Sequence, residues 1–272
     1  MFCLIGIVLK RAVEEYFSNF KVMLSFGVLF VFIAIFALFD QFFFSAGSVF
    51  FSLNSNIVGS LLGVIVSLFF LYFFSFFISL TVYSVHRDVQ RIDFDTYWNT
   101  LFKDAAVKIF IFYLMLAVIF YVISYIGFVL GFSFYALLIN LIIGLLVIFV
   151  PQSIVLDETS VLDAVSNSVG FLKSNFFVSM VVFLLITIAL TIVIWVELYL
   201  QSIGFIGVII SFFLVLVVLV PFFEQAKSYA YLMRNDLLKG NEFVYARAPR
   251  TKKEKPKFGV RLREKPRKGS KI

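Results

Sequence analysis

Long apolar runs almost free of charge decide what this chain can fold into. Hydrophobic residues make up 62% of the 272 residues and charged residues only 14%, and the charges gather between the runs. Soluble domains are about 45–50% apolar and about 25% charged, so this composition excludes an ordinary soluble domain. Because about 20 apolar residues cross a bilayer as a helix, we predict an all-α integral membrane protein.

The runs predict six transmembrane helices followed by a disordered tail. We expect the helices over residues 22–39, 57–83, 109–127, 134–150, 176–200 and 208–223. Pro151 should end the fourth helix, and Pro221 should end or break the sixth. Helix should continue over 224–239 and close at Gly240. The transmembrane domain would then occupy 1–240, and the proline-bearing segment 241–272 would be disordered.

The segments on one side of the predicted helices are short and uncharged. Residues 40–56 read as a loop with aromatic anchors at Phe42, Phe43 and Phe44, residues 128–133 as a tight turn, and residues 201–207 as a short loop. All 23 Lys and Arg lie outside these three segments. The positive-inside rule therefore places both termini in the cytoplasm.

Three amphipathic segments precede pairs of spans and predict interfacial helices with one apolar stripe each. The stripes are Leu9, Val13, Tyr16, Phe17 and Phe20 in the N-terminal arm, Phe94, Trp98, Leu101, Phe102 and Ala105 within 86–108, and Val161, Leu162, Val165, Val169 and Leu172 within 150–176. In the third segment Ser160 can cap the helix, with Asp163 three residues on.

The stripes also suggest a threefold repeat of interfacial helix plus transmembrane hairpin. Val13, Phe17 and Phe20 match Trp98, Phe102 and Ala105, which in turn match Val165, Val169 and Leu172. The sequence LVIFVP before Pro151 recurs as LVVLVP before Pro221. Against this, the Ser-Asn-Phe sequence at 18–20 matches the one at 174–176 only after a shift of about one helical turn. The repeat is thus a structural hypothesis.

Two stretches resemble a known family. The first comprises Pro151, VLDE at 155–158, LDAVSNS at 162–168 and KSN at 173–175; the second comprises Pro221 and 226–234. They resemble six-helix membrane domains fused to bacterial glycerophosphodiester phosphodiesterases, and stand-alone bacterial and archaeal relatives of unknown function. No phosphodiesterase domain fits in the remaining residues. The resemblance therefore implies a membrane module without the catalytic half, and it assigns no catalytic residue.

Residues that carry catalytic or metal chemistry are scarce. His86, Arg87 and Asp88 spell the HRD of kinases, but no glycine-rich phosphate loop or DFG accompanies them. One His and one Cys make no metal-ligand cluster. We therefore expect no enzymatic activity, no metal and no cofactor.

Polar residues inside the predicted spans are mild, and none is ionisable at mid-membrane. They are Ser67, Ser75, Ser79, Asn140, Thr187 and Thr191. Asn140 is expected to bond a neighbouring helix rather than a substrate. A transporter would need such side chains to line a polar cavity near the midplane. Glu197, at the outer end of the fifth span, is expected to contact headgroups or water, with a substrate or cation site as the minor alternative.

The tail carries the net charge of the protein. From Val244 onward it has twelve basic residues against Glu254 and Glu264, a net charge of +10, while residues 1–243 sum to −3. The basic residues are Arg247, Arg250, Lys252, Lys253, Lys255, Lys257, Arg261, Arg263, Lys265, Arg267, Lys268 and Lys271. Anionic lipid headgroups and RNA are the candidate partners, since both recognise Lys and Arg without requiring a fold. A solvated topology anchor is the third interpretation.

These observations favour a non-enzymatic component of the cell membrane that organises or senses the bilayer, or a partner protein, through its cytoplasmic face and basic tail. Two alternatives stay open: a small-solute transporter or channel, and a membrane-insertion or ribosome-associated factor. The sequence leaves the oligomeric state and any ligand undetermined.

Overall fold

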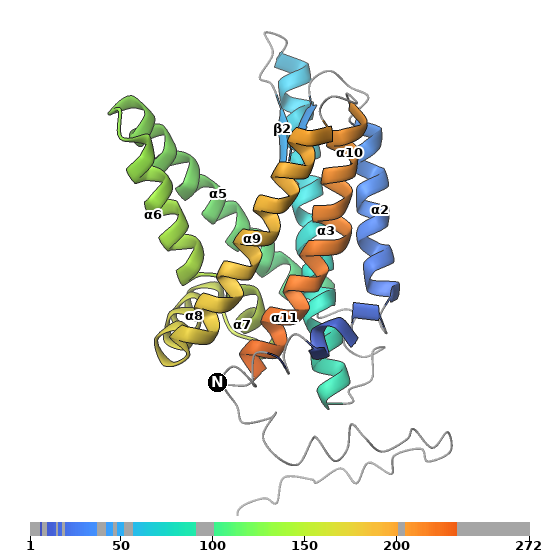
Figure 1. Ribbon diagram of the computed structural model, residues 1–272, viewed down its shortest axis with the longest axis vertical. Helices are drawn as coiled ribbons and strands as arrows, with labels where there is room; N and C mark the ends of the chain where they lie inside the picture. Colours follow the sequence, from blue (N-terminus) through green and yellow to red (C-terminus); the bar gives the residue numbers. More distant parts are fainter. Residues whose placement is uncertain are drawn as a thin grey trace, which may run out of the picture.

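The computed structural model describes residues 6, 10–14, 16–17, 20–36, 42–45, 48–51, 57–90, 101–200 and 205–232 (Figure 1). Apart from one short β-hairpin, the architecture is all-helical. The α-helices are α2 (Phe20–Phe36), α3 (Ile57–Gln90), α5 (Ala106–Val129), α6 (Ser133–Leu146), α7 (Val150–Leu156), α8 (Val161–Ser174), α9 (Phe176–Leu200), α10 (Phe205–Phe213) and α11 (Val220–Leu232). Two π-helical turns, η1 (Leu101–Ala105) and η3 (Leu214–Leu219), continue directly into α5 and α11.

Five described helical segments are long and apolar enough to cross a membrane, which suggests a multi-pass membrane protein. They are Val58–Val85, Leu101–Val129, Ser133–Leu156, Phe176–Leu200 and Gly207–Leu232. The first predicted span, 22–39, corresponds to α2, whose 17 residues include the shorter apolar stretch Leu24–Ile33. A sixth span and the threefold repeat therefore stay predictions.

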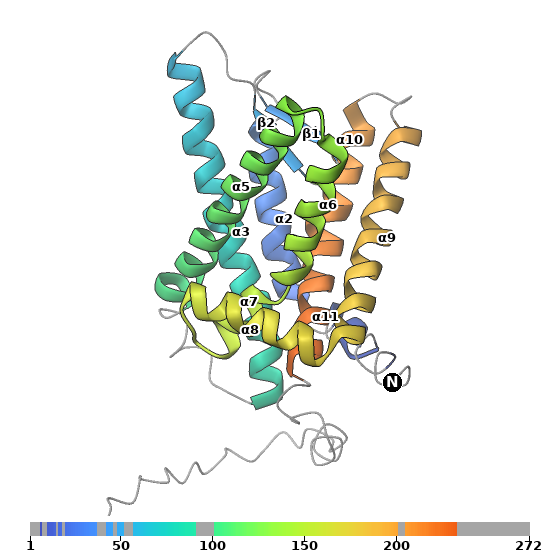
Figure 2. The ribbon, with the colours of Figure 1, turned by 90° about the vertical axis from the view of Figure 1, so that its left-hand side faces the viewer.

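The long helices form antiparallel pairs, α2 with α3, α5 with α6, and α9 with α10. Helix α8 lies across one end of this bundle, roughly perpendicular to the long helices, with α7 beside it (Figure 2). We call this end the α8 end, and the end with the α5–α6 turn the opposite end. Helix α11 descends to the α8 end and packs against α3, α7 and α9.

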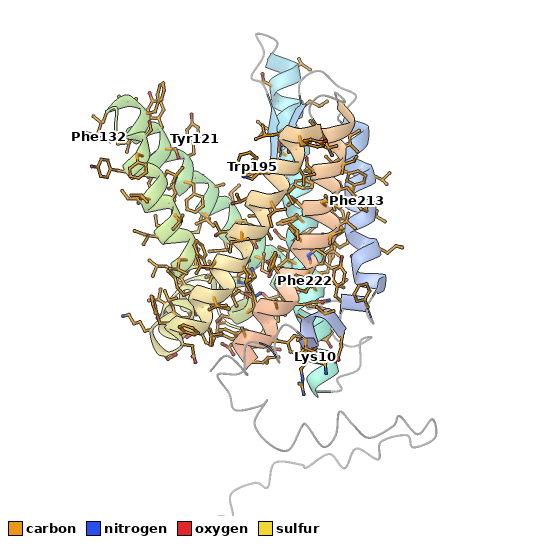
Figure 3. The ribbon with its side chains drawn as sticks, viewed as in Figure 1. Lys10, Tyr121, Phe132, Trp195, Phe213 and Phe222 are labelled. Atoms are coloured by element: carbon orange, nitrogen blue, oxygen red, sulfur yellow. The ribbon has the colours of Figure 1, made fainter. Side chains whose placement is uncertain are left out.

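Exposed aromatic side chains gather toward the opposite end. Tyr121, Phe132 and Trp195 lie there, away from Lys10 at the α8 end (Figure 3). All three aromatic side chains are exposed, as is Tyr199 in the last turn of α9. Tyr and Trp side chains such as Tyr121, Trp195 and Tyr199 concentrate at membrane–water interfaces, because the ring suits hydrocarbon and its polar group suits headgroups. Their position is compatible with one membrane–water boundary at this end of the bundle.

The predicted loop over 40–56 contains a β-hairpin, so this prediction was wrong for eight residues. Strand β1 (Phe42–Ser45) pairs antiparallel with β2 (Ser48–Phe51), with Phe42 opposite Phe51. Aromatic and β-branched residues favour extended backbone, and two residues including Gly47 connect the strands, which is the usual length of a hairpin turn.

The interfacial helix predicted within 86–108 is wrong at both ends, and its middle, 91–100, lies outside the described residues. Residues 86–90 are the last turns of α3, because no helix breaker follows Tyr83, while residues 101–108 open the next long helix through η1. Within its predicted stripe, Leu101 and Ala105 are buried and Phe102 is exposed. Phe94 and Trp98 lie outside the described residues.

Both prolines begin a helix rather than ending one. Helix α6 stops at Leu146, the chain turns over three residues, and α7 starts with Pro151 in its first turn. Proline is well suited to the first turn, where its missing N–H has no helical partner to lose. Before Pro221, η3 replaces regular α-helix, and the chain stays helical to Leu232. The wider π turn accommodates the missing N–H and the bulk of the ring.

The stripe predicted on α8 coincides with the buried face in part, since Leu172 is buried and Val161 and Val165 pack against the core. The cap is confirmed, since the Asp163 backbone N–H donates to Ser160 Oγ over 3.3 Å. The buried residues of α8 are Ala164, Ser168, Phe171 and Leu172, whereas Leu162 is 74% exposed. Ser168 explains the remaining difference, because its hydroxyl donates to the Leu146 carbonyl oxygen over 2.7 Å and turns that face inward.

The N-terminal stripe divides in the same way. Ala12 and Tyr16 are buried, while Val13 and Phe17 are exposed. Tyr16 packs edge-to-face on Phe222 of α11, with ring centroids 5.9 Å apart. Of the predicted stripe, Tyr16 therefore contacts the protein, while Val13 and Phe17 face the surroundings.

Candidate functional site

Polar side chains are buried where α11 meets α7 at the α8 end. Gln152 of α7 and Glu224, Gln225, Lys227 and Ser228 of α11 are each at most 7% exposed. We call these five residues the polar cluster. Because a polar or charged side chain is costly to bury, such a group in a membrane-embedded bundle is a functional-site candidate in its own right.

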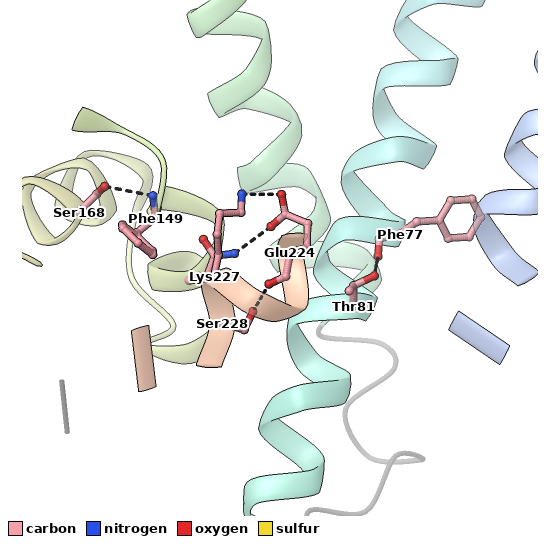
Figure 4. Close-up of polar contacts among 8 residues, drawn as sticks. Phe77, Thr81, Phe149, Ser168, Glu224, Lys227 and Ser228 are labelled. Atoms are coloured by element: carbon pink, nitrogen blue, oxygen red, sulfur yellow. Dashed lines mark hydrogen bonds and ion pairs between the residues drawn. The ribbon is translucent and has the colours of Figure 1, made fainter. Parts of the chain in front are cut away.

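A buried ion pair forms the centre of the polar cluster. Lys227 Nζ lies 2.6 Å from Glu224 Oε1, and Gln152 Nε2 donates to Glu224 Oε2 over 2.8 Å (Figure 4). The Ser228 hydroxyl donates to the Glu224 carbonyl oxygen over 2.7 Å. Tyr113 of α5 also lies within electrostatic range of Glu224. One carboxylate therefore connects α7 to α11 and faces α5.

The two proline motifs bring these residues together. Gln152 follows Pro151 directly, and Glu224 stands three residues after Pro221. Each proline follows an interruption of regular α-helix, the turn after α6 in one case and η3 in the other. The similarity between LVIFVP and LVVLVP therefore corresponds to two helix irregularities, and α7 and α11 contact each other just beyond them.

A second set of hydrogen bonds ties α8 and the end of α7 to α11. The Tyr231 hydroxyl donates to Asp157 Oδ2 at the C-cap of α7. Asn167 Nδ2 of α8 donates to Ser153 Oγ of α7 over 3.1 Å. Around Tyr231, the rings of Phe149 and Phe171 pack at centroid distances of 6.2 and 5.2 Å. Helices α7, α8 and α11 thus form one connected unit.

Not every polar atom of the polar cluster has a protein partner. Gln152 Oε1 and both amide atoms of Gln225 are buried and make no hydrogen bond within the described part of the chain. Buried amide groups nearly always have a partner, because leaving one unpaired costs about 1–3 kcal/mol. These three atoms indicate that the hydrogen bonding of the cluster is completed by something other than the described side chains.

Polar residues predicted inside the spans bond either a neighbouring helix or their own helix, although Asn140 Oδ1 is buried without a described partner. Asn140 Nδ2 donates to Ser124 Oγ of α5 over 3.0 Å, which confirms the predicted bond to a neighbouring helix. Ser75, Thr187 and Thr191 each donate to a carbonyl oxygen one turn back in their own helix. These four side chains therefore do not converge on a polar cavity, and they lend the transporter alternative no support.

Glu197 is not placed as predicted. It is only 8% exposed, and Ser211 of α10 donates to its Oε2 atom over 2.7 Å. The carboxyl group points between α9 and α10, so the expected contact with headgroups or water is wrong. A buried serine partner explains why an acidic residue is tolerated in an otherwise apolar helix.

The other residues singled out in the sequence lie beyond what the structure describes. This holds for all twelve basic residues of the tail and for Cys3. The backbone of His86 belongs to α3, but its side chain is not described. The predicted contacts of the tail therefore stay predictions.

Sequence reasoning missed Glu224 and Lys227 because the sixth span was ended at residue 223, and the helix predicted over 224–239 was not counted as part of it. The helix does continue through these residues, and the apolar segment that could cross a membrane runs to Leu232. One signal was available: two opposite charges at helical spacing, with Gln225 and Ser228 between and after them, directly follow an apolar run.

Comparison of the chain with protein-family models, with curated proteins and with solved structures finds no match.

Proposed function

We propose that this protein is a non-enzymatic multi-pass component of the cell membrane that organises or senses the bilayer through its cytoplasmic face. In this proposal both termini and the α8 end are cytoplasmic, and the tail from 244 to 272 contacts anionic lipid headgroups. The bundle, with α2 as a sixth span, serves as the membrane anchor for that face.

The observation that carries the proposal is the position of α8 across the end of the long helices (Figure 2). An amphipathic helix perpendicular to transmembrane helices lies in the interface plane, where apolar side chains reach acyl chains and charged ones reach headgroups. Leu162 and Lys173 are both exposed on α8, and Phe17 is exposed in the N-terminal arm. The same end therefore presents apolar and basic groups to the surroundings.

The charge distribution supports an anionic lipid as the partner. The tail follows α11 in the chain and carries a net charge of +10. A basic residue near an anionic surface contributes about 1 kcal/mol of binding free energy, so twelve of them suffice for strong, salt-sensitive adsorption. The unit of α7, α8 and α11 would hold the origin of the tail at a fixed place.

The proposal is tested with the full-length protein in neutral-lipid nanodiscs, mixed with vesicles and floated through a density gradient. We expect co-flotation with vesicles that contain phosphatidylserine, loss of co-flotation in high salt, and none with pure phosphatidylcholine. A variant with all twelve tail basic residues changed to Gln should not co-float, while Lys173→Gln should retain binding. Equal binding to neutral vesicles, or binding by the neutralised tail, contradicts the proposal.

RNA is the competing partner, since phosphate attracts the same tail. In a parallel experiment, membranes carrying the protein are stripped and incubated with ribosomes. Salt-sensitive co-sedimentation that is lost with residues 244–272, without binding to anionic vesicles, would assign the protein to the ribosome-associated class instead.

A further inference from the structure

The polar cluster has more hydrogen-bonding groups than protein partners. The Lys227 ammonium has three N–H donors, and its only described polar contact is Glu224 Oε1. Gln152 uses its amide nitrogen on Glu224 Oε2, which leaves Oε1 buried without a described partner. Donors and an acceptor are therefore left over on two side chains that flank the same carboxylate.

Gln225 adds a second set of unused groups. It is 0% exposed, and neither amide atom bonds a described residue. It precedes Ala226 and Lys227 on α11, a helix whose residues 224–232 are all buried. A dry amide in this position would destabilise the fold, because its hydrogen bonds to water in the unfolded chain would be lost without replacement.

We propose that the polar cluster is a binding site for water, with bound water molecules donating to Gln152 Oε1, accepting from Lys227 Nζ and pairing with the Gln225 amide. Water matches these groups because it both donates and accepts, and buried waters in proteins typically make about three hydrogen bonds to polar groups of this kind. An anion matches poorly, since the Lys227 charge is already neutralised by Glu224. A cation would have to approach the ammonium group of Lys227.

With water bound, the contact between α7 and α11 is hydrated rather than dry. Water-mediated hydrogen bonds are nearly as favourable as direct ones, so the ion pair stays stable without a tightly packed shell. The contact between α7 and α11 is then a hydrated polar seam. This conclusion rests on the polar cluster alone and holds whatever the tail binds.

Radiolytic hydroxyl-radical footprinting of the full-length protein in nanodiscs tests the site, because radicals formed from bound water label side chains next to it. Phe149 lies one helical turn before Gln152 and is 0% exposed. Phe26 is equally buried but belongs to the apolar cluster between α2 and α3. We expect labelling of Phe149 and none of Phe26; an unlabelled Phe149 overturns the proposal.

A stability measurement on Gln225→Leu tests it independently. If the amide were dry, this substitution would remove an unpaired group and raise the midpoint of thermal unfolding by several degrees. Because we assign water to the amide, we expect the midpoint to stay unchanged or fall. Thr81→Val is the matched control, since Thr81 is equally buried but its hydroxyl bonds the Phe77 carbonyl oxygen. A midpoint that rises for Gln225→Leu, but not for the control, overturns the proposal.

Discussion

At the scale of single residues, the ion pair between Glu224 and Lys227 has the largest energetic consequences. The side chains are 7% and 9% exposed, so each would be an uncompensated charge in a low-dielectric interior if the other were removed. A buried pair is thus weak evidence of net stabilisation, but a strong constraint on substitution. A substitution of one partner should therefore destabilise the protein far more than a substitution of both partners together.

The first prediction concerns this non-additivity. Lys227→Met should lower the free energy of unfolding by about 3–5 kcal/mol, because it leaves the Glu224 carboxylate buried without its cation. The double variant Glu224→Met/Lys227→Met should recover most of that loss, because neither charge remains. The measurement is unfolding of the purified protein in detergent. A double variant as unstable as Lys227→Met would show that the pair is not what stabilises this contact.

The second prediction follows from Tyr16, for which burial raises the pKa from the ordinary 10.0 to about 12. Below pH 10 the hydroxyl is protonated in both folded and unfolded chains. Between pH 10 and 12 the unfolded chain ionises while the folded chain largely does not, so stability should fall as the pH rises through this window. Denaturant titrations across this window should show a smaller loss for Tyr16→Phe. Tyr199→Phe, at an exposed position, should behave as the unmodified protein does.

The hydrogen bonds of Ser160 and Asn140 could be predicted from the sequence, whereas the burial of Glu224 could not. Ser160 before an apolar stripe predicts a helix cap, and Asn140 in an apolar helix predicts a bond to its neighbour; both follow from short-range physics. Glu224 was missed because the helix predicted over 224–239 was treated as lying beyond the sixth span. Its burial depends on the packing of α11 against α3, α7 and α9, which the sequence pattern does not reveal.

At the scale of elements, positions next to prolines and charges were the least predictable. Helix α9 has the predicted bounds because an uninterrupted apolar run defines it. The buried face of α8 was predicted only in part, because Ser168 forms tertiary hydrogen bonds to Leu146 and Phe149 that the hydrophobic pattern does not contain. Periodicity therefore predicts that a helix exists more reliably than which of its faces is buried.

The third prediction belongs to the α5–α6 pair, where a Cβ atom added at Gly127 would lie 2.4 Å from Ala136 Cβ. Gly127→Ala should force the two helices apart near their turn and cost about 1–3 kcal/mol, the usual range for overpacking. Adding Ala136→Gly removes the contacting atom and should restore the midpoint of thermal unfolding. Gly144→Ala, with nothing within 4 Å, is the control. If the second change restores nothing, the two helices do not approach closely at Gly127.

At the scale of the whole molecule, charge and architecture support one orientation. The described basic residues lie toward the α8 end, as Lys10 does in Figure 3, and exposed aromatic rings gather toward the opposite end. Under the positive-inside rule we therefore propose that the α8 end is cytoplasmic. The number of spans decides whether the two termini share that side: an even count puts them together, and an odd count separates them.

The fourth prediction is a topology measurement on whole cells with a membrane-impermeant maleimide, and it tests the central claim most directly. Cys3 is the only cysteine, so it reports the N-terminus unaided. In a Cys3→Ser background, Ser270→Cys reports the C-terminus and Phe132→Cys reports the α5–α6 turn. We predict that position 132 is labelled in intact cells and that positions 3 and 270 are labelled only after permeabilisation. Labelling at position 3 but not at 270 in intact cells would show that α2 does not cross the membrane. Labelling at both positions in intact cells would show that the protein has the opposite orientation.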